Sequence, residues 1–379
     1  MNTLLSEDHA LLVDAVRRFG RAELVERDAA WDRAEESCCP HLSPLYEMGL
    51  MGMRAPEDAG GLDCPMLPYA RIIRELAWAS PSVAVTTGVH NMVIEIVRTF
   101  AHEPLRSELL AALPTPGNMG AFAISEANAG SDASAATTRA ERVPGGWKLS
   151  GSKMWVTNGM TGRWFMVMAR TGATGTRKDL SMLVMDARQP GITRNPIHGK
   201  MGIRASETVE MSLDGVFVPE GNMLGDEGWG MRIGLSALDG GRIGIASQAL
   251  GIADAALAEM TRYARQREVF GQRLASLQAI QGMIADSQTE ILAAEKLIDR
   301  AAWCKDEKRP FTQEASMAKL FASEVANRVA DRAVQTHGGY GYVHEFRVER
   351  LYRDARITRI YEGTSEIQRV VIARNLLRD

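Results

Sequence analysis

An acidic residue near the C-terminus, Glu362, is the strongest candidate for chemistry in this sequence. It follows the apolar residues Ile360 and Tyr361 and is itself followed by Gly363. Apolar neighbours desolvate a carboxyl group and raise its pKa toward the value that suits a general base taking a proton from carbon. The glycine removes bulk, so a ligand can come close. The alternative is an acid that only decorates the N-terminus of the next helix, where negative charge is favoured.

The helix behind this turn can be placed from its cap. Ser365 and Gln368 have the spacing of a capping box, so we expect the helix to run from Glu366 to about Leu377. Glu362 then lies just outside the helix, on a turn from which its side chain can point into a cavity.

Two stretches in the middle of the chain could hold a planar or phosphorylated ligand. In residues 121–135, small and hydroxyl residues follow a strand-like run and expose backbone N–H groups, although a simple β-turn explains them too. In residues 153–159, Trp155 can pack against a flat ring and the Thr157 hydroxyl can bond a ring nitrogen. A buried tryptophan of a β-core is the alternative there.

Two later stretches combine charged and flexible residues. Arg267 offers a bidentate fork for pyrophosphate and Phe270 offers a packing face, whereas the alternative is a solvated arginine on a helix. Residues 335–354 contain glycines that permit close backbone approach, or that form a helix cap and a structural loop. Within this stretch, Arg350 and Asp354 are four residues apart and are expected to pair along a helix.

The pattern of helix-type and strand-type residues divides the chain into three regions. Residues 1–120 are mostly helical, residues 121–230 consist of short β-rich runs separated by turn residues, and residues 231–379 are helical again. We therefore expect a mainly α protein with a central β-domain, either barrel or sandwich, and a C-terminal helical bundle. The α–β–α order argues against a doubly wound sheet.

Helix ends and helix faces can also be predicted. Ser6 is expected to cap the first helix, and a long helix is expected to end near His337 because glycines follow it. Two apolar stripes with helical spacing predict packed faces. The first stripe consists of Leu277, Ile280, Ile284, Ser287, Ile291, Ala294, Ile298 and Ala301, and the second of Met317, Phe321, Val325, Val329 and Ala333.

Bulk properties exclude several functional classes. The chain has 379 residues and a net charge of −3, so there is no electrostatic case for nucleic acid. We find no apolar run long enough to span a bilayer and no signal-peptide core, which favours the bacterial cytoplasm or a trimmed mitochondrial form. The four cysteines lack a CxxC pair and the histidines lack metal-ligand spacing, so we expect reduced thiols and no metal site. Dinucleotide and P-loop glycine motifs are absent.

Taken together and in this order, these stretches resemble the acyl-CoA dehydrogenase family over essentially the whole chain. Residues 123–135 are similar to the first family signature, and residues 354–377 are similar to its C-terminal motif. Residues 238–257 most resemble the short-chain, butyryl-type branch. The second signature matches at Gln335, Gly338, Gly339, Gly341, Tyr342, Glu345, Arg350 and Asp354.

The resemblance implies a cofactor, FAD, bound in an extended form between the β-domain and a C-terminal four-helix bundle. Around the flavin ring it implies Phe122, Ile124, Ser125, Gly130, Ser131, Trp155, Val156 and Thr157. For the pyrophosphate and adenine, contributed by a partner subunit of a homotetramer, it implies Arg267, Phe270, Gln278, Gln335, Gly338 and Gly339. Thr364 and Glu366 would close over the flavin. Substrate contacts would come from Ser131, Asp239, Arg242, Tyr361 and Gly363.

The implied reaction is α,β-dehydrogenation of an acyl-CoA, with a short or branched acyl group. Glu362 would take the α-proton, hydride would pass to the flavin, and the electrons would go to an electron-transferring flavoprotein. One subfamily carries its base at the position of Gly241 here, so no second base competes. Ala127 and Asn128 replace the common Pro-Gly of the flavin loop. An oxidase or monooxygenase on the same fold and a non-catalytic flavin- or CoA-binding scaffold are the alternatives.

Overall fold

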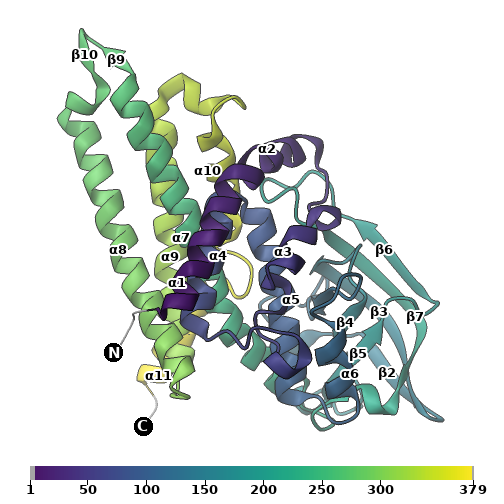
Figure 1. The fold of residues 1–379 in the computed structure, drawn as a ribbon. Coiled ribbons are helices and arrows are strands. Elements are labelled where there is room, and N and C mark those ends of the chain that lie inside the picture. The colour runs from purple at the N-terminus through teal and green to yellow at the C-terminus, as the bar shows by residue number, and fades with distance from the viewer. Residues whose placement is uncertain (1–4, 378–379) are drawn as a thin grey trace.

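The order of secondary structure follows the three regions expected from the sequence. The computed structural model describes residues 5–377, in which helices come first, an eight-stranded sheet second and long helices last (Figure 1). The predicted fold class is confirmed. The helix α5 lies between the long C-terminal helices and the sheet, so it touches both partners that could form a site (Figure 1).

Serine residues cap two of the N-terminal helices, and the first of these caps was predicted. Ser6 caps the first helix by accepting a hydrogen bond from the backbone N–H of His9 at 3.3 Å. Ser80 caps the fifth helix in the same way, with Pro81 in the first helical position. The helices are α1 (Glu7–Phe19), α2 (Val25–Ala34), α3 (Ser43–Glu47), α4 (Met66–Ala79), α5 (Pro81–Phe100) and α6 (Leu105–Ala112), with a π-helical turn at Gly20–Leu24.

The central sheet has the strand order β6-β7-β3-β2-β4-β5-β8, and β1 pairs with β4 in parallel. The short β-rich runs expected in residues 121–230 form strands, the longest of which are β3, β4, β5 and β7. The strands are β1 (Gly120–Ala123), β2 (Arg139–Val143), β3 (Gly146–Thr157), β4 (Trp164–Arg170), β5 (Leu180–Asp186), β6 (Ile192–Pro196), β7 (Thr208–Pro219) and β8 (Met223–Leu224).

Alternate residues of the sheet enter two different cores. Phe165 and Val167 of β4 join residues of β3 and β7 in one cluster, although β4 is not hydrogen-bonded to either strand. The sheet therefore curves so that side chains on one of its faces pack against one another. Met166 and Met168 point the other way, into a cluster shared with α5 and the first C-terminal helix. This two-residue period fixes the β-domain onto the helices.

The C-terminal region has three long and two short helices. They are α7 (Gly230–Gln266), α8 (Gln278–Asp306), α9 (Thr312–His337), α10 (Arg347–Ile357) and α11 (Ser365–Leu376), with a small hairpin of β9 (Glu268–Val269) and β10 (Gln272–Arg273) between α7 and α8. Among the described helices, α7 alone is long and apolar enough to cross a membrane. Its most apolar window is 78% buried, which is typical of a core helix.

The apolar stripe of α8 is buried only along part of its length. Its second half, from Ser287 to Ala301, packs into the core that joins α1, α4, α7, α8, α9 and α10. The first half, Leu277 to Ile284, is only partly buried. On α9, Val325, Val329 and Ala333 of the predicted stripe are buried and Phe321 packs against the same core, whereas Met317 is only half-buried. The helix α9 ends at His337 as expected.

Two local predictions were wrong. Thr364, not Ser365, caps α11, because its Oγ1 accepts the bond from the backbone N–H of Ile367, while Ser365 bonds to Glu324 instead. Arg350 does not pair with Asp354 along α10.

The partners of that second pair lie on other elements. Arg350 forms an ion pair with Asp28 of α2, and Asp354 accepts a hydrogen bond from the backbone N–H of Ile203. Arg350 therefore connects α10 to α2, and Asp354 connects α10 to the backbone at Ile203.

Candidate active site

Glu362 lies on a tight bend between α10 and α11. Its φ is +51° and that of Gly363 is +92°, so two successive residues occupy the left-handed half of conformational space. This region is rare for a glutamate and is found mostly where surrounding structure enforces it. The bend turns the side chain of Glu362 inward, as predicted.

Two side chains hold the carbonyl groups of this bend. Lys319 of α9 is buried, and its Nζ donates a hydrogen bond to the carbonyl oxygen of Gly363 at 2.6 Å. Gln368 of α11 donates to the same oxygen at 2.9 Å and to the carbonyl oxygen of Glu362 at 3.3 Å. The backbone N–H of Glu362 donates to no other group in residues 5–377, so it is free to bind a ligand.

The carboxyl group of Glu362 rests directly on α7. A Cβ placed on Gly241 would lie 2.2 Å from Glu362 Oε2, so only glycine leaves room for the carboxylate. Oε2 is buried and has no hydrogen-bond partner among the described residues. Burial raises the pKa of Glu362 to about 7, although the positive charges of Lys319 and Arg242 oppose the rise.

Charged residues on α7 and α9 brace the other side of this group. Arg242 is buried and its Nη1 donates to Asp239 Oδ1 at 2.5 Å, while Thr312 donates to Asp239 Oδ2 at 2.6 Å. Burial lowers the pKa of Arg242, and the negative charges of Asp239 and Glu362 oppose that fall. Arg242 therefore supplies a fixed positive charge that acts on the Glu362 carboxyl group.

Tyr361 is held by a hydrogen bond rather than left open for a ligand. Its hydroxyl donates to Gln248 Oε1 of α7, and Gln248 in turn donates to the carbonyl oxygen of Pro81. The ring packs against the core shared by α5, α7 and the sheet. Tyr361 therefore ties the turn to α7 and α5, which fixes the apolar wall next to Glu362.

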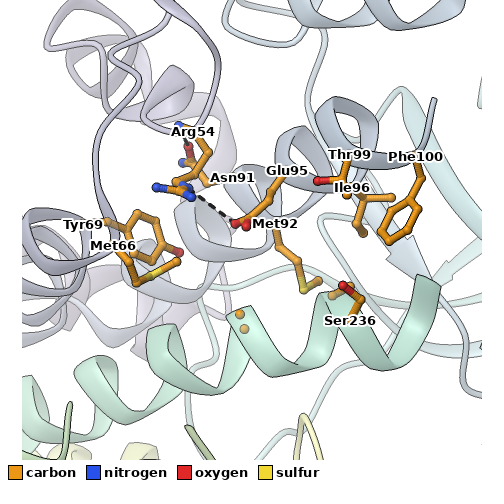
Figure 2. Close-up of a pocket in the computed structure, with 13 residues that line it drawn as sticks. Arg54, Met66, Tyr69, Asn91, Met92, Glu95, Ile96, Thr99, Phe100 and Ser236 are labelled. Carbon is orange, nitrogen blue, oxygen red and sulfur yellow. Dashed lines mark hydrogen bonds and ion pairs between the residues drawn. The ribbon is translucent and has the colours of Figure 1, made fainter. Parts of the chain in front are cut away.

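A small cavity lies between α5 and α7, next to this carboxyl group (Figure 2). Its volume is about 40 Å³, and Gly240, Gly241 and Tyr69 form part of its wall. Gly241 also packs against the Glu362 carboxylate, so the cavity and this carboxylate share one residue of α7. The other lining residues are Arg54, Met66, Asn91, Met92, Glu95, Ile96, Thr99, Phe100, Ser236 and Ala237.

The β-domain residues predicted around a ring come together at one edge of the sheet. The backbone N–H of Met154 donates to the carbonyl oxygen of Ser125 at 2.9 Å, which places the two predicted stretches side by side. Trp155 sits at a register shift in β3, has φ of +63° and is 61% exposed. It is therefore not a buried core tryptophan. Val156 next to it is buried, and Thr157 is half-buried.

The preceding strand links this edge to α7. Phe122 and Ile124 are half-buried against the core of α5 and α7, and a Cβ on Gly234 of α7 would lie 2.9 Å from Ile124 Cδ1. Gly130 and Ser131 are exposed, and a Cβ on Gly130 would meet no atom within 4 Å. The loop is thus open to a ligand.

The glutamate in this loop has a structural role that the sequence did not reveal. Glu126 is buried and forms an ion pair of 2.7 Å with the buried Lys153 of β3. It also accepts hydrogen bonds from the backbone N–H groups of Thr137 and Thr138. The positive charge of Lys153 and these bonds outweigh burial and lower the pKa of Glu126 to about 2. Glu126 therefore holds the loop in place as a permanent anion.

The remaining predicted cofactor residues lie far from Glu362 in the same chain. Gly241 and Gln266 are 25 residues apart on α7, which corresponds to about 37 Å. Arg267 follows Gln266, stacks over Tyr340 and is exposed, and the ring of Phe270 is 94% exposed. Gln278, Gln335, Gly338 and Gly339 are also exposed at this end of the helices.

The start of α11 completes the predicted set. Thr364 is the N-cap and is half-buried, whereas Glu366 lies in the first turn and is exposed. Bonds from its own backbone N–H and from Thr364 lower the pKa of Glu366, so it is an anion at neutral pH.

Comparison with known proteins decides the family. Models of the N-terminal, middle and C-terminal domains of acyl-CoA dehydrogenase match residues 6–115, 121–216 and 228–377. The chain belongs to the acyl-CoA dehydrogenase family. Its members are flavoprotein oxidoreductases of fatty acid metabolism, and this chain is an enzyme of that kind.

Several proteins similar to this acyl-CoA dehydrogenase are of the short-chain type. It is 40% identical over 375 residues to the mitochondrial short-chain specific acyl-CoA dehydrogenase of Mus musculus, covering 99% of this chain and 91% of the relative. It is 37% identical to butyryl-CoA dehydrogenase from Megasphaera elsdenii, with full coverage of both chains and a TM-score of 0.97. The same values describe a chain in the structure of the electron transferring flavoprotein of Acidaminococcus fermentans.

The described residues fit a flavin at the edge of the sheet. Trp155 presents an exposed aromatic face there, and the half-buried hydroxyl-bearing residues Ser125 and Thr157 lie beside it. Open space at Gly130 leaves room for a ligand against the backbone. A flat aromatic face with adjacent hydrogen-bonding groups is suited to a ring with polar edges.

Proposed function

We propose that this acyl-CoA dehydrogenase uses FAD to convert a short or branched acyl-CoA to its 2,3-enoyl-CoA. The observation that carries the proposal is the Glu362 carboxyl group, which packs against Gly241, a residue that also lines the cavity, and whose Oε2 is buried without a hydrogen-bond partner among residues 5–377. Its pKa of about 7 suits a base that must accept a proton and release it again near neutral pH.

The chain's own residues would act on the thioester as follows. Glu362 accepts the α-proton at its carboxylate, and its free backbone N–H donates to the thioester oxygen as negative charge builds there. Lys319 and Gln368 hold the bend so that both groups keep their position. The apolar wall around Tyr361 excludes water from the base. When bound, FAD supplies the acceptor for the β-hydride.

The flavin would be held by residues from two copies of the chain. Ser125, Trp155 and Thr157 would surround the ring in one copy, with Phe122, Ile124, Val156, Gly130 and Ser131 shaping the same edge. Because about 37 Å separates Gly241 from the end of α7, Arg267 and Phe270 would serve a site in the partner copy. This arrangement supports a homo-oligomer, which we propose to be a tetramer.

The electron acceptor we propose is an electron-transferring flavoprotein. The similarity to a chain in the structure of the electron transferring flavoprotein of Acidaminococcus fermentans supports it. Reoxidation of the reduced enzyme by such a flavoprotein is expected to be much faster than reoxidation by air in a stopped-flow experiment.

Substitution of the base tests the proposal. Glu362→Gln keeps the shape of the side chain, so the purified protein should retain yellow flavin. Its bleaching by butyryl-CoA should fall about 100- to 10,000-fold, the usual contribution of a general base. The control is Glu47→Gln on the exposed side of α3, which should bleach like the wild type. Bleaching of Glu362→Gln at a rate near that of the wild type would refute the assignment.

A further inference from the structure

The wall of the cavity beside Glu362 is unusually polar for a pocket that receives an acyl chain. Arg54 and Glu95 line it directly, and Figure 2 shows both pointing toward each other across the space between the first loops and α5. The ammonium group of Lys305 lies against Gly240, since a Cβ there would be 2.7 Å from Lys305 Nζ. Two charged side chains therefore line a cavity of about 40 Å³, and a third, Lys305, pairs with one of them.

Within this cluster, Glu95 is already satisfied. Lys305 Nζ lies 2.5 Å from Glu95 Oε1, and Arg54 Nε lies 3.4 Å from Glu95 Oε2. Burial favours the neutral acid, but the positive charges of Lys305 and Arg54 outweigh it and lower the pKa of Glu95 to about 2. Glu95 is a fixed anion that balances one of the two cations, mainly Lys305.

Arg54 is the group left with unused hydrogen-bonding capacity. Its side chain is only 13% exposed, and its Nη1 donates to the carbonyl oxygen of Cys64. Although Nε is at ion-pair distance from Glu95, its N–H has no hydrogen-bond partner among residues 5–377. An unmade hydrogen bond of a buried charged donor is costly, so such a donor is usually matched by an acceptor.

Hydroxyl groups continue this polar character along the cavity. Tyr69, Thr99 and Ser236 line it, and their side-chain oxygens make no hydrogen bond with any other described residue. Asn91, by contrast, is fully used, because it bonds to the backbone of Arg54, Leu50 and Thr87. An acyl chain ending in a methyl group would leave the Arg54 N–H without an acceptor.

The charged cluster and the Glu362 carboxylate approach neighbouring residues of α7. A Cβ on Gly241 would touch the Glu362 carboxylate, and a Cβ on the preceding residue, Gly240, would lie 3.8 Å from Glu95 Oε2. Neighbouring Cα atoms are about 3.8 Å apart, so the base and the charged cluster face consecutive residues of one helix. A water molecule needs at least about 10–15 Å³, so 40 Å³ admits only a few atoms.

We propose that the substrate is a short acyl-CoA whose chain ends in an oxygen hydrogen-bond acceptor, and that Arg54 binds this oxygen. The proposal rests on the proposed function and names the substrate class for the same site. The acceptor is a hydroxyl, carbonyl or carboxylate oxygen placed a few bonds beyond the carbon that loses its proton to Glu362. Arg54 determines specificity and takes no part in the chemistry.

A matched panel of CoA thioesters tests the proposal on the flavin-loaded enzyme. The panel contains butyryl-CoA and valeryl-CoA as apolar members, and 4-hydroxybutyryl-CoA and glutaryl-CoA as members with a terminal hydroxyl or carboxylate. We expect kcat/KM for flavin bleaching to be at least about 10-fold higher for one polar member than for both apolar members. Equal or higher values for the apolar members would overturn the proposal while leaving the proposed function intact. Failure of all four thioesters, together with common branched ones, would overturn both.

Variants of Arg54 separate its role from the general polarity of the site. Arg54→Met should lower the ratio of polar to apolar kcat/KM by about 10- to 100-fold. Arg54→Lys keeps the charge without the Nε donor and should lower the ratio less, and it serves if the methionine variant does not retain flavin. The control is Arg98→Met on α5, whose exposed partner is Asp63. A wild-type ratio in a flavin-retaining Arg54 variant would overturn the proposal.

Discussion

At the scale of single residues, the protonation state of Glu362 should govern activity. Burial raises the pKa of this carboxyl to about 7, and only the ionised form can accept a proton. We therefore expect kcat/KM for a good acyl-CoA to rise about tenfold per pH unit below pH 7 and to level off above about pH 8. Flavin bleaching measured from pH 5.5 to 9 provides the profile. A midpoint near 4.5, the ordinary pKa of glutamate, would contradict it.

Lys319 should set the position of that midpoint. Its positive charge lowers the pKa of Glu362, and desolvation lowers the pKa of Lys319 itself to about 8. Removing the charge in Lys319→Met should move the midpoint of the kcat/KM profile upward by about one pH unit. A merely structural lysine would change kcat without moving the midpoint. Lys296→Met on the exposed face of α8 is the control and should leave the profile unchanged.

The sequence points to Glu362 as the proposed base but not to the groups that surround its carboxyl group. Glu362 stands out because an acid, a glycine and apolar neighbours are adjacent in the chain. Lys319 comes 43 residues earlier, within an apolar helix, and nothing in its own neighbourhood indicates that it reaches the carbonyl oxygen of Gly363. Glu126 lies in the loop that the sequence predicts to bind a ligand, but its partner Lys153 lies on β3, 27 residues later. Contacts of this kind depend on the folded arrangement of distant segments.

At the scale of secondary structure elements, the close approach of the α10–α11 turn to α7 depends on Gly241. The added methyl group of Gly241→Ala would lie 2.2 Å from Glu362 Oε2, so the flexible carboxylate must move rather than the helix. A displacement of about 1 Å at the reacting group lowers rates about 100-fold, so we expect bleaching to fall by at least that factor with flavin retained.

Alanine at a second glycine provides the matched control for this element. Gly282 lies on α8, where an added Cβ would meet no atom within 4 Å. Gly282→Ala should keep wild-type activity and gain about 0.5–1 kcal/mol of stability from the higher helix propensity of alanine. Equal activity of the two alanine variants would show that the contact between α7 and the turn is unimportant.

Most elements could be predicted because their patterns are local. The β-rich runs include β3, β4, β5 and β7, and the cap at Ser6 and the helix end at His337 were confirmed. The cap of α11 was one residue off, since Thr364 and Ser365 carry equivalent hydroxyls and only the distant Glu324 decides which one turns away. The Arg350–Asp354 pair failed for the same reason, because Asp28 of α2 takes the arginine.

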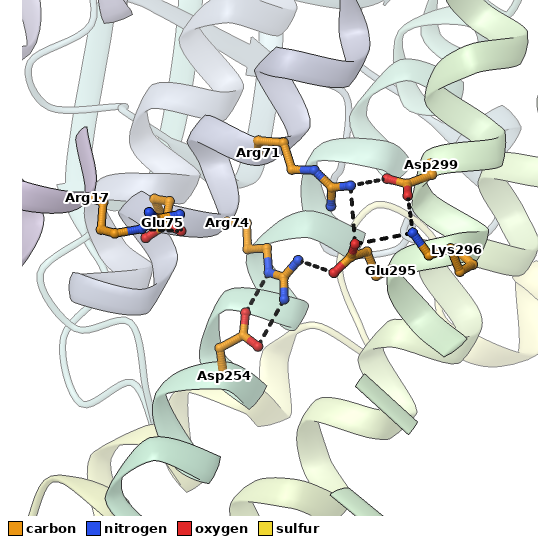
Figure 3. Close-up of polar contacts among 8 residues, drawn as sticks. All are labelled: Arg17, Arg71, Arg74, Glu75, Asp254, Glu295, Lys296 and Asp299. Carbon is orange, nitrogen blue, oxygen red and sulfur yellow. Dashed lines mark hydrogen bonds and ion pairs between the residues drawn. The ribbon is translucent and has the colours of Figure 1, made fainter. Parts of the chain in front are cut away.

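At the scale of the whole molecule, the N-terminal and C-terminal helices are joined by ion pairs as well as by a shared core (Figure 3). Arg74 of α4 bonds to both carboxylate oxygens of Asp254 on α7, at 2.5 and 3.1 Å, and to Glu295 on α8 at 2.6 Å. Arg71 adds bonds to Glu295 and to Asp299, which is fully buried. These bonds fix α7, the helix that contains Gly241, relative to α4.

Loss of Arg74 should therefore destabilise the protein more than loss of another paired arginine. Burial raises the pKa of Asp254 although Arg74 opposes the rise, and Arg74→Met would leave this carboxylate largely desolvated without a partner. Breaking such a pair costs about 3–5 kcal/mol when fully buried, so about 2–4 kcal/mol is expected for these partly buried groups. Arg17→Met removes one of two arginine partners of Glu75, and the Arg17 side chain is 44% exposed, so its loss should cost under about 1 kcal/mol. Urea midpoints of the two variants measure the difference, and equal midpoints would show that the shared apolar core alone joins the two helical parts.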